Sequence, residues 1–531
     1  MRERLPRFGK EVPLAAVFLL AAFVAAVFAN NIGELYLWAL PVPLAAAAVL
    51  GWGWGAVCRI IFKNKHKATV FCAAAAVLFV SYGGAQELVG AVSGLLPWLG
   101  RWHVAEGVVV FFLWAAAAAA IFLVVRRTKR DLAGAGRFLT IAAAAALIIP
   151  TGRIIQYEAV KRIEGGSASP LVLPEARADV AGRKLPDIYY IVPEDYSSPA
   201  VMKDYFNSDN SDFTAFLEKE GFYVPEKPSS NYPKSFLSVA SALNMEYLDY
   251  LGSHRNSSDQ TIVNPLIDDN NVMRFLAEYG YSYYQMGSWW EPTKYNPLAT
   301  DNYTLERQNR LGMSEFTYAL VAATMVRPVF DRIYPAVALG QSDGDQRRRI
   351  LYQFATLPEV ARLPGRKMVF VHIIAPHGPY VFGKDCEFVR SKDIAAIPEE
   401  VNYANQAACI DKKLEAAVGQ IMDISKKTAV IMIQSDEGAP FLGGRLSPAD
   451  NWKTADDALL KEKFPILAAY YLPGVSKKAF YPTMTPVNGF RVVLNQYFSA
   501  GLALLPDRNY IFADIKHLYE FTDVTKRVTQ P

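Results

Sequence analysis

Five apolar segments fill the first 150 residues of this 531-residue chain and limit its fold more than any other feature. They cover roughly residues 12–29, 35–57, 68–99, 104–125 and 138–150. A helix needs about 20 apolar residues to cross the hydrocarbon core of a bilayer, with some tolerance. We therefore expect about five membrane-spanning helices, although only part of the third segment can span and the fifth is short.

Basic residues indicate how these helices are oriented. Lysines and arginines gather at residues 2–10, 59–67 and 126–130, whereas the alternate loops carry almost no basic charge. Cytoplasmic loops are enriched in these residues. The pattern predicts a cytoplasmic N-terminus and places everything after about Gly152 on the outer side of the membrane. For the first segment a cleaved signal peptide is the alternative, but four further spans favour a membrane anchor.

The rest of the chain is expected to form a separate outer domain. Residues 154–184 are charged and contain Gly, Ser and Pro, which is typical of a linker or a juxtamembrane helix. From residue 185 to 531, strand patterns alternate with helical patterns, which predicts an α/β domain with a mostly parallel sheet and helices on both faces. The expected domains are a transmembrane domain over 1–153, this linker, and an outer domain over 185–531.

The cysteines and the charge agree with this topology. Cys386 and Cys409 fall in the expected outer domain, where an oxidising compartment allows a disulfide between them. Cys58 and Cys72 lie in the membrane part and are interpreted as small packing residues. The net charge of +4 is largely explained by the cytoplasmic loops, so it gives no reason to expect a nucleic-acid partner.

Three apolar strand patterns, far apart in the chain, each run into candidate metal ligands. Glu194 follows the first, His372 and His377 belong to the second, and Asp436 and Glu437 follow the third. Because open α/β sheets bind ligands at the carboxyl ends of their strands, the three stretches predict one metal-assisted site. The adjacent acids are the strongest signal, since their repulsion in a crevice costs free energy unless a cation compensates it.

Each of these residues also has a structural interpretation. Asp436 and Glu437 suit a polar turn, Glu194 suits a helix cap, and His372 suits a hydrogen-bonded core position. His377 lies in a rigid turn flanked by prolines, which favours contact with a substrate or a metal.

A candidate nucleophile lies in a fourth stretch. Pro233 stops any preceding helix, so Ser235 can lie at the N-terminus of the next one. There the backbone amides and the helix dipole favour an alkoxide and an incoming phosphate. An ordinary helix cap is the alternative, because serine is common at that position. The prediction that Ser235 is a nucleophile therefore depends on its occurring together with the candidate ligands at the three strand ends.

Together these stretches resemble the sulfatase-like branch of the alkaline phosphatase superfamily. The membrane plan is similar to that of lipoteichoic acid synthases and lipid A phosphoethanolamine transferases, which place five spans before an outer catalytic domain. The similarity runs through nearly all of residues 185–512, and its motifs occur in the order expected for the family. They are residues 189–194, 230–235, 372–382, 434–438 and 485–491.

The resemblance implies a role for each matching residue. Glu194 matches the first metal ligand, Ser235 the nucleophile that also ligates the metal, and Asp436 a following ligand. His377 matches a histidine that contacts the substrate phosphate or a second metal, and it is a candidate proton donor to the leaving group. The remaining candidates for substrate binding are Lys234, His372, Asn488 and Arg491.

The chain departs from the family pattern at Glu437, where relatives usually have a histidine after the aspartate. With Glu437 as a ligand, the metal would have an all-oxygen shell, which suits Mg, Mn or Ca better than Zn. We expect one divalent cation, with Mn or Mg favoured over Zn or Ca. Residues 235–239 also lack the Pro and Arg that formylglycine formation usually requires, which argues against an arylsulfatase.

The resemblance therefore implies a membrane-bound transferase in a bacterial-type plasma membrane, with its C-terminal domain on the outer side. It would move a phospho-headgroup, such as phosphoglycerol or phosphoethanolamine, from a phospholipid donor to a glycan or lipid acceptor through a Ser235-linked intermediate. A phosphodiesterase or phosphatase that uses water as the acceptor is one alternative. A non-catalytic sulfatase-fold subunit in envelope biosynthesis is the other, and Glu437 is its main support.

Overall fold

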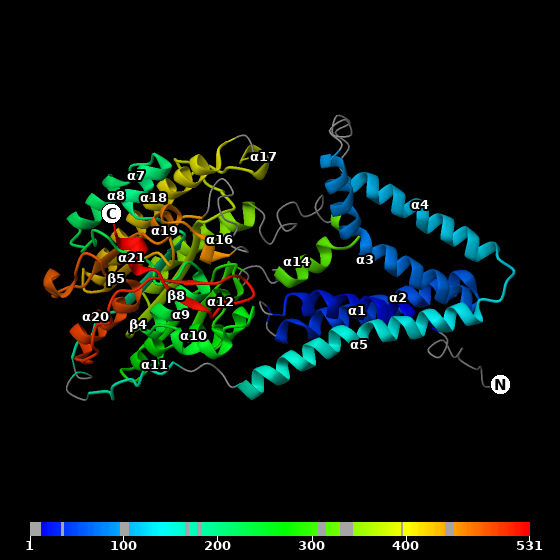
Figure 1. Ribbon diagram of the computed structural model, residues 1–531, viewed down its shortest axis with the longest axis horizontal. Coiled ribbons are helices and arrows are strands. Elements are labelled where there is room, and N and C mark those ends of the chain that lie inside the picture. The colour runs from blue at the N-terminus through cyan, green and yellow to red at the C-terminus, as the bar shows by residue number, and fades with distance from the viewer. Residues whose placement is uncertain are drawn as a thin grey trace. The chain divides into compact units, whose positions relative to one another are not determined.

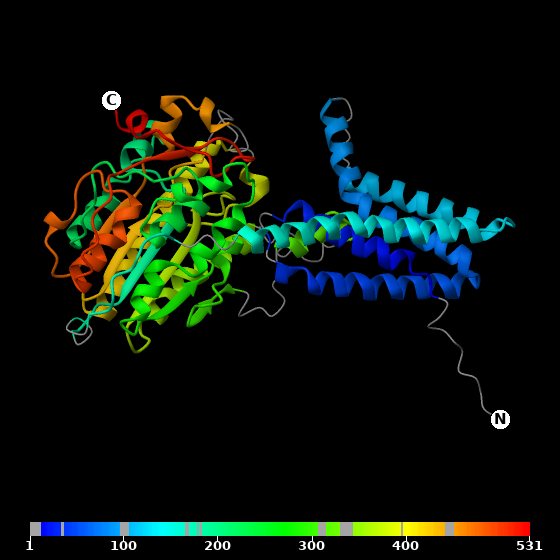
Figure 2. The same cartoon turned by 60° about the horizontal axis from the view of Figure 1, so that its bottom comes forward.

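A computed structural model describes residues 12–530 apart from 33–34, 36, 96–105, 165–168, 178–179, 181–182, 306–314, 330–342, 395–396 and 441–450 (Figures 1 and 2). The chain forms two compact units. The first comprises Met1–Gly165 and Met313–Gly340, and the second comprises Gly166–Gly312 and Gln341–Pro531. Met313–Gly340, which the sequence analysis places in the outer domain, therefore belongs to the first unit.

Five helices, α1 to α5, form most of the first unit. Four of them, α2 to α5, are long and apolar enough to cross a membrane, whereas α1 has only 16 residues. Four of the five expected spans are thus supported in the part of the chain that the structure describes. Helix α5 continues past Pro150, so the start of the expected linker is helical. The bounds are α1 Ala15–Asn30, α2 Pro41–Phe62, α3 Lys65–Leu95, α4 Glu106–Arg127 and α5 Ala133–Glu164.

Glycines let α1 and α2 pack closely. A Cβ atom at Gly51 would lie 2.7 Å from Val17 Cα, and one at Gly55 would lie 2.6 Å from the Pro13 carbonyl oxygen. Small residues at such contacts are typical of helices that pack inside membranes, because close van der Waals contact there takes the place of the hydrophobic effect.

Helix α14 (Glu315–Ala322) brings part of the later segment into the first unit. Its Phe316 ring packs edge-to-face on Phe28 of α1, with 5.6 Å between the ring centroids. Just beyond α14, the Gly83 amide of α3 donates a hydrogen bond to the Ala323 carbonyl at 2.9 Å. A Cβ atom at position 83 would lie 2.6 Å from Ala323 Cα, so this contact requires glycine. Figure 1 shows α14 in green beside the blue α1.

A six-stranded sheet forms the centre of the second unit, with the strand order β3-β2-β4-β1-β5-β6. Within it, β1 pairs in parallel with β4 and β5, and β6 is the antiparallel strand at the edge. Every residue of β1, β4 and β5 is buried, which is why these strands are continuous apolar runs in the sequence. The predicted mostly parallel sheet is therefore confirmed. The bounds are β1 Ile188–Glu194, β2 Ser282–Met286, β3 Asp301–Tyr303, β4 Lys367–Pro376, β5 Val430–Gln434 and β6 Ala468–Tyr471.

Helices cover both faces of this sheet, because successive side chains of a strand point to opposite faces. Tyr190 and Val192 of β1 pack in one core with α9, α10, α11 and α20, whereas Tyr189 and Ile191 pack in a second core with α7, α8, α16 and α18. Figure 1 shows α7, α8 and α18 at the top of this unit and α10, α11 and α20 at its bottom. The bounds are α7 Pro199–Phe206, α8 Ser211–Lys219, α9 Ser235–Asn244, α10 Asn264–Asp268, α11 Asn271–Ala277, α16 Asp343–Ala361, α18 Glu399–Ser425 and α20 Pro486–Phe498.

The other described elements are short. Two strands, β7 and β8, pair in a small antiparallel sheet. The bounds are β7 Tyr510–Phe512, β8 Phe521–Asp523, α12 Glu291–Lys294, α17 Ser391–Ile394, α19 Asp457–Lys463 and α21 Thr525–Thr529, with 3₁₀ turns at Leu37–Ala39, Asp249–His254, Gln260–Ile262, Trp452–Thr454 and Lys477–Ala479.

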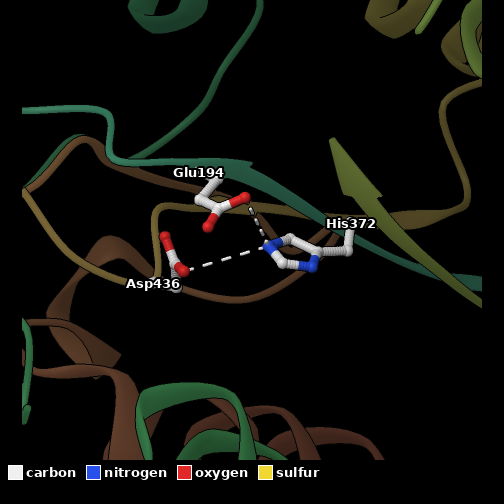
Figure 3. A group of neighbouring side chains, drawn as sticks. All are labelled: Glu194, His372 and Asp436. Carbon is white, nitrogen blue, oxygen red and sulfur yellow. Dashed lines mark ion pairs between the residues drawn. The ribbon is translucent and has the colours of Figure 1, made fainter. Parts of the chain in front are cut away.

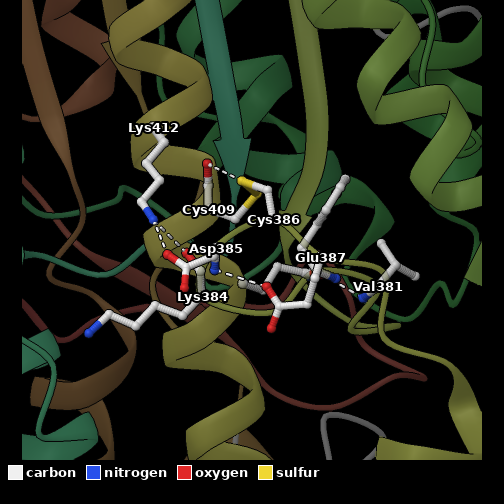
Figure 4. Close-up of a disulfide and its surroundings, with 9 residues drawn as sticks. Val381, Lys384, Asp385, Cys386, Glu387, Cys409 and Lys412 are labelled. Carbon is white, nitrogen blue, oxygen red and sulfur yellow. Dashed lines mark hydrogen bonds and ion pairs between the residues drawn. A yellow bond between two sulfur atoms is a disulfide. The ribbon is translucent and has the colours of Figure 1, made fainter.

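A disulfide joins Cys386 to Cys409, with their Cα atoms 5.0 Å apart (Figure 4). It ties the loop after β4 to α18, next to an exposed ion pair of 2.7 Å between Asp385 and Lys412. The bridge therefore fixes the chain on the carboxyl side of β4. The thiols of Cys58 and Cys72 in the first unit are free and buried.

Candidate active site

Three neighbouring strands bring an imidazole and two carboxylates together at their carboxyl ends. Glu194 is the last residue of β1, His372 lies in β4, and Asp436 follows the end of β5. His372 Nε2 lies 3.9 Å from Glu194 Oε2 and 3.8 Å from Asp436 Oδ2 (Figure 3). Each of the three residues is buried and offers one ligand atom, and these atoms all lie within 4.8 Å of one another.

The donor atoms of this group fit a divalent cation. Glu194 Oε2, His372 Nε2 and Asp436 Oδ2 are buried, and none of them has a hydrogen-bond partner among the described residues. Leaving such atoms unpaired costs free energy, and native proteins rarely do so. Separations of 3.8 and 3.9 Å are too long for hydrogen bonds but suit atoms that share one metal ion.

The pKa shifts of these three residues also favour a bound cation. Burial and then the charge of Asp436 raise the pKa of Glu194 well above its usual range. Burial and the neighbouring Asp195 raise the pKa of Asp436 to about 6. Burial and then His377 lower the pKa of His372 to about 3, so its imidazole is neutral and has a lone pair to offer. A bound cation would compensate the two carboxylate charges that burial disfavours.

Ser235 lies beside this group at the start of α9. The preceding residue, Lys234, has an extended backbone, so the helix begins at Ser235 as the sequence predicts. The Ser235 hydroxyl donates a hydrogen bond to Glu194 Oε1 at 3.0 Å and makes a longer one of 3.4 Å to Glu437 Oε1. The structure thus brings the predicted nucleophile to the predicted first ligand.

Glu437 faces a lysine that belongs to none of the sequence motifs. Glu437 Oε2 lies 3.2 Å from Lys463 Nζ, which also donates to Asp195 Oδ1 at 3.0 Å and to the Gly438 carbonyl at 2.9 Å. All three charged side chains are buried. Glu437 is not among the three residues whose ligand atoms converge, and its metal-binding role stays a prediction.

A pocket of about 320 Å³ opens onto Ser235. Its polar side includes the lysine that precedes Ser235 and the histidine of the proline-flanked turn, and the rest of its wall is mainly aromatic and aliphatic. His377 lies 3.9 Å from Asp195 through its Nε2 atom and remains partly exposed. The pocket is lined by Glu194, Lys234, Ser235, Phe236, Gln260, Trp289, Trp290, His377, Phe512, Ile515 and Leu518.

A sequence model of the family described as Sulfatase matches residues 186–467, which is more than half of the chain. The chain belongs to the sulfatase family. The resemblance to the sulfatase-like branch of the alkaline phosphatase superfamily is thereby confirmed. No curated protein matches the sequence significantly.

Three solved structures of phosphoethanolamine transferases match this chain at low sequence identity. The integral membrane lipooligosaccharide phosphoethanolamine transferase A of Neisseria meningitidis is 13% identical, with a TM-score of 0.38, and the match covers 92% of this chain and 94% of that one. The periplasmic domain of EptC from Escherichia coli is 10% identical, with a TM-score of 0.43 and coverage of 66% and 97%. The corresponding domain from Campylobacter jejuni is 11% identical, with a TM-score of 0.36 and coverage of 60% and 92%.

Two predicted substrate-binding residues of this sulfatase-family chain serve its packing. Asn488 donates to the Tyr481 hydroxyl and the Leu505 carbonyl, each at 2.8 Å. Arg491 donates to the Met245 carbonyl at 2.8 Å and to the Ala503 carbonyl at 2.6 Å. Both side chains are buried, and neither lines the pocket. The surroundings of Asn488 and Arg491 therefore give no support to substrate binding.

His372 does not line the pocket either, and its neighbours explain its position. Its Nδ1 atom lies 2.9 Å from Thr293 Oγ1, and Gln353 donates to its carbonyl at 2.8 Å. Neither partner carries a signal in the sequence, because single Thr and Gln residues far from His372 have no pattern that marks them. Only the folded domain brings Thr293 of α12, Gln353 of α16 and His372 of β4 together.

Proposed function

We propose that this sulfatase-family protein is a membrane-bound, metal-dependent transferase. It moves a phospho-headgroup from a phospholipid donor to a glycan or lipid acceptor of the cell envelope through a covalent intermediate on Ser235. The supporting observation is the position of Ser235: its hydroxyl lies at a helix N-terminus, 3.0 Å from Glu194 of a buried three-residue group that fits a divalent cation. Four helices with the length and composition of membrane spans agree with a lipid donor.

The first step needs a charged nucleophile and a place for its proton. A divalent cation held by Glu194 and Asp436 would lower the pKa of the Ser235 hydroxyl and stabilise charge on the phosphate. Ser235 Oγ forms the new bond to phosphorus, and its proton passes to one of the carboxylates that accept its hydrogen bonds, Glu194 or Glu437. Lys234 and the first amides of α9 lie where they can hold the phosphate oxygens.

His377 supplies the leaving group with a proton in this scheme. The bond between phosphorus and the diacylglycerol oxygen breaks, and that oxygen takes a proton from the imidazolium of His377, which lines the same pocket. In the second step the acceptor hydroxyl gives its proton to His377 and attacks phosphorus. Ser235 Oγ then leaves and regains its own proton from the carboxylate.

Label transfer tests this function directly. Full-length protein is mixed with vesicles that contain phosphatidylethanolamine or phosphatidylglycerol with a labelled headgroup, and the protein-bound label is counted after an acid quench. We expect label on the wild type in the presence of divalent cation and none on Ser235→Ala. Ser238→Ala is the matched control, because Ser238 lies on the same helix but donates to the Tyr232 carbonyl.

Absence of label from the metal-loaded wild type, or equal labelling of Ser235→Ala, would contradict the proposal. Release of the headgroup to water at the same rate with and without an acceptor glycan would instead identify a hydrolase.

A further inference from the structure

We propose that His372, and not Glu437, is the third protein ligand of the metal centre, so that one imidazole and two carboxylates hold the cation. The proposal rests on the proposed function, because it concerns the metal centre that assists Ser235. It decides between two predictions for His372, which the sequence makes both a candidate metal ligand and a candidate for substrate contact, and it removes Glu437 from the predicted ligands.

The positions of the ligand atoms favour His372. Its Nε2 atom lies 3.9 Å from Glu194 Oε2 and 3.8 Å from Asp436 Oδ2, and all three atoms are buried without a hydrogen-bond partner among the described residues. Two atoms that each bind one cation at about 2 Å are separated by about 3–4 Å, and His372 Nε2 lies at such a distance from each carboxylate oxygen. Glu437 also belongs to the described part of the chain but does not join this group.

A chain of hydrogen bonds leaves the lone pair of His372 Nε2 free for a metal. Ser288 Oγ lies 3.3 Å from the Trp290 carbonyl, which can only accept, so Ser288 donates its hydroxyl proton there. With the Ser288 proton placed on that carbonyl, Thr293 Oγ1, 2.8 Å from Ser288 Oγ, donates to Ser288. The other contact of the Thr293 hydroxyl is His372 Nδ1 at 2.9 Å, which consequently carries the imidazole proton. With Nδ1 protonated, Nε2 is the ligand atom of a neutral imidazole.

Two further contacts hold His372 in place, one to its backbone and one to its ring. Gln353 donates to the His372 carbonyl at 2.8 Å, and the Trp290 ring meets the imidazole edge-to-face with 5.7 Å between centroids. Partners of this kind fix the orientation of metal-binding histidines and raise their affinity. His372 therefore directs Nε2 toward the two acids (Figure 3). Its Nδ1 atom has Thr293 as a fixed partner on the other side of the ring.

Glu437 also has a buried Oε2 atom without a hydrogen bond among the described residues, but a lysine lies beside it as a counter-charge. Its Oε2 atom lies 3.2 Å from Lys463 Nζ, and its Oε1 atom lies 3.4 Å from Ser235 Oγ. Charge balance agrees, because Glu194 and Asp436 already neutralise a divalent cation and a third carboxylate would leave the centre negative beside an anionic phosphate. Glu437 is thus a hydrogen-bond acceptor for the nucleophile, and Lys463 is its counter-charge.

This ligand set changes the expected metal. An all-oxygen shell suits Mg or Mn, but a shell with one imidazole nitrogen shifts the preference toward Zn and other transition metals. We therefore expect the protein to bind Zn²⁺ more tightly than Mg²⁺, which is opposite to the preference that the sequence predicts from Glu437.

The test measures metal binding rather than activity. Full-length, detergent-solubilised protein is titrated with Zn²⁺ and Mg²⁺ by calorimetry, and X-ray absorption of the zinc-loaded protein reports imidazole ligands. We expect the imidazole signature in the wild type and in Glu437→Gln, with zinc affinities that differ by less than about 10-fold. His372→Ala should lose the signature and bind Zn²⁺ about 100-fold more weakly or worse.

A second variant separates metal binding from folding, since His372 is completely buried. Thr293→Val keeps the shape of the side chain and removes its bond to His372 Nδ1. We expect it to stay folded by circular dichroism and to bind Zn²⁺ about 10-fold to 100-fold more weakly.

The outcomes distinguish this inference from the function on which it rests. A wild-type protein that binds no divalent cation would overturn the proposed function. An imidazole signature that survives His372→Ala, zinc binding that is lost in Glu437→Gln, or an unchanged affinity in Thr293→Val would overturn this inference and leave the proposed function standing.

Discussion

At the scale of single residues, Lys463 balances the charge beside Ser235, the proposed nucleophile. Its ammonium group is buried between Asp195 at 3.0 Å and Glu437 at 3.2 Å. Burial opposes its charged form, but the two carboxylates outweigh burial and raise its pKa. We predict that Lys463→Met destabilises the protein by about 3–5 kcal/mol, because two buried carboxylates lose their counter-charge. Urea unfolding of the full-length protein in detergent measures this loss.

An exposed ion pair provides the matched control. Lys427 also pairs with a carboxylate, Glu220 at 3.0 Å, but 59% of its side chain is exposed to solvent. Lys427→Met should therefore cost no more than about 1 kcal/mol. Equal losses for the two lysine variants would contradict a charge-balancing role for Lys463.

The sequence predicts the acids of the site but not which of them faces the proposed metal position. Asp436 and Glu437 follow an apolar strand, and their residue types indicate a cation site. Successive side chains of an extended chain point in different directions, so their separate partners depend on the backbone after β5. Lys463 gives no sequence signal, because lysines usually face solvent and its burial is a consequence of tertiary packing.

At the scale of elements, α16 fixes the carboxyl ends of β2 and β4 through one side chain. Gln353 Nε2 donates to the carbonyls of His372 at 2.8 Å, Gly287 at 3.2 Å and Met286 at 3.3 Å. We predict that Gln353→Leu lowers the free energy of unfolding by about 1–3 kcal/mol, because it leaves buried carbonyls without donors. Urea unfolding measures this loss. The variant should also weaken metal binding, since His372 loses a backbone anchor, and titration calorimetry measures that affinity.

An exposed glutamine is the control for this element. Gln420 lies on the solvent side of α18, so Gln420→Leu should change stability by no more than about 0.5 kcal/mol. Metal affinity that stays at the wild-type value in Gln353→Leu would show that α16 does not position His372.

Elements with strong local patterns are the predictable ones. The buried strands β1, β4 and β5 follow from their apolar runs, and the start of α9 at Ser235 follows from the nearby Pro233. The contact of Thr293 with His372 is not predictable in this way, because the two residues are 79 positions apart in the chain. Contacts over such separations depend on the order of the strands, which local patterns do not encode.

At the scale of the whole molecule, the chain returns to the first unit through α14. A protease site inserted after Glu164 would cut the connection that precedes the second unit. We predict that the C-terminal fragment still sediments with membranes after a high-salt wash, because residues 315–329 stay packed on α1 and α3. Fractionation and immunoblotting after cleavage measure its retention.

Adjacent glycines on α3 supply a matched pair for this prediction. A Cβ atom at Gly83 would lie 2.6 Å from Ala323 Cα, whereas one at Gly84 meets nothing within 4 Å. Gly83→Leu should therefore release the cleaved fragment, and Gly84→Leu should not. Equal release from both variants would show that α14 is not the second anchor.

The sequence predicts a membrane part followed by an outer part. It does not predict that a later segment, which includes α14, belongs to the first unit. Long apolar segments and basic clusters are local patterns, and they are enough to mark most of the first unit. Helix α14 is too short to span a membrane and lies among alternating strand and helix patterns, so nothing local separates it from the outer domain.

The proposed function requires Ser235 to become covalently linked to the headgroup at a metal centre. Peptide mapping by mass spectrometry can detect this link after full-length protein is incubated with phosphatidylethanolamine and phosphatidylglycerol vesicles and quenched in acid. We expect one added phospho-headgroup on the peptide that contains Ser235, present with divalent cation and absent after chelation. An adduct on another residue, or none on the metal-loaded protein, would contradict it.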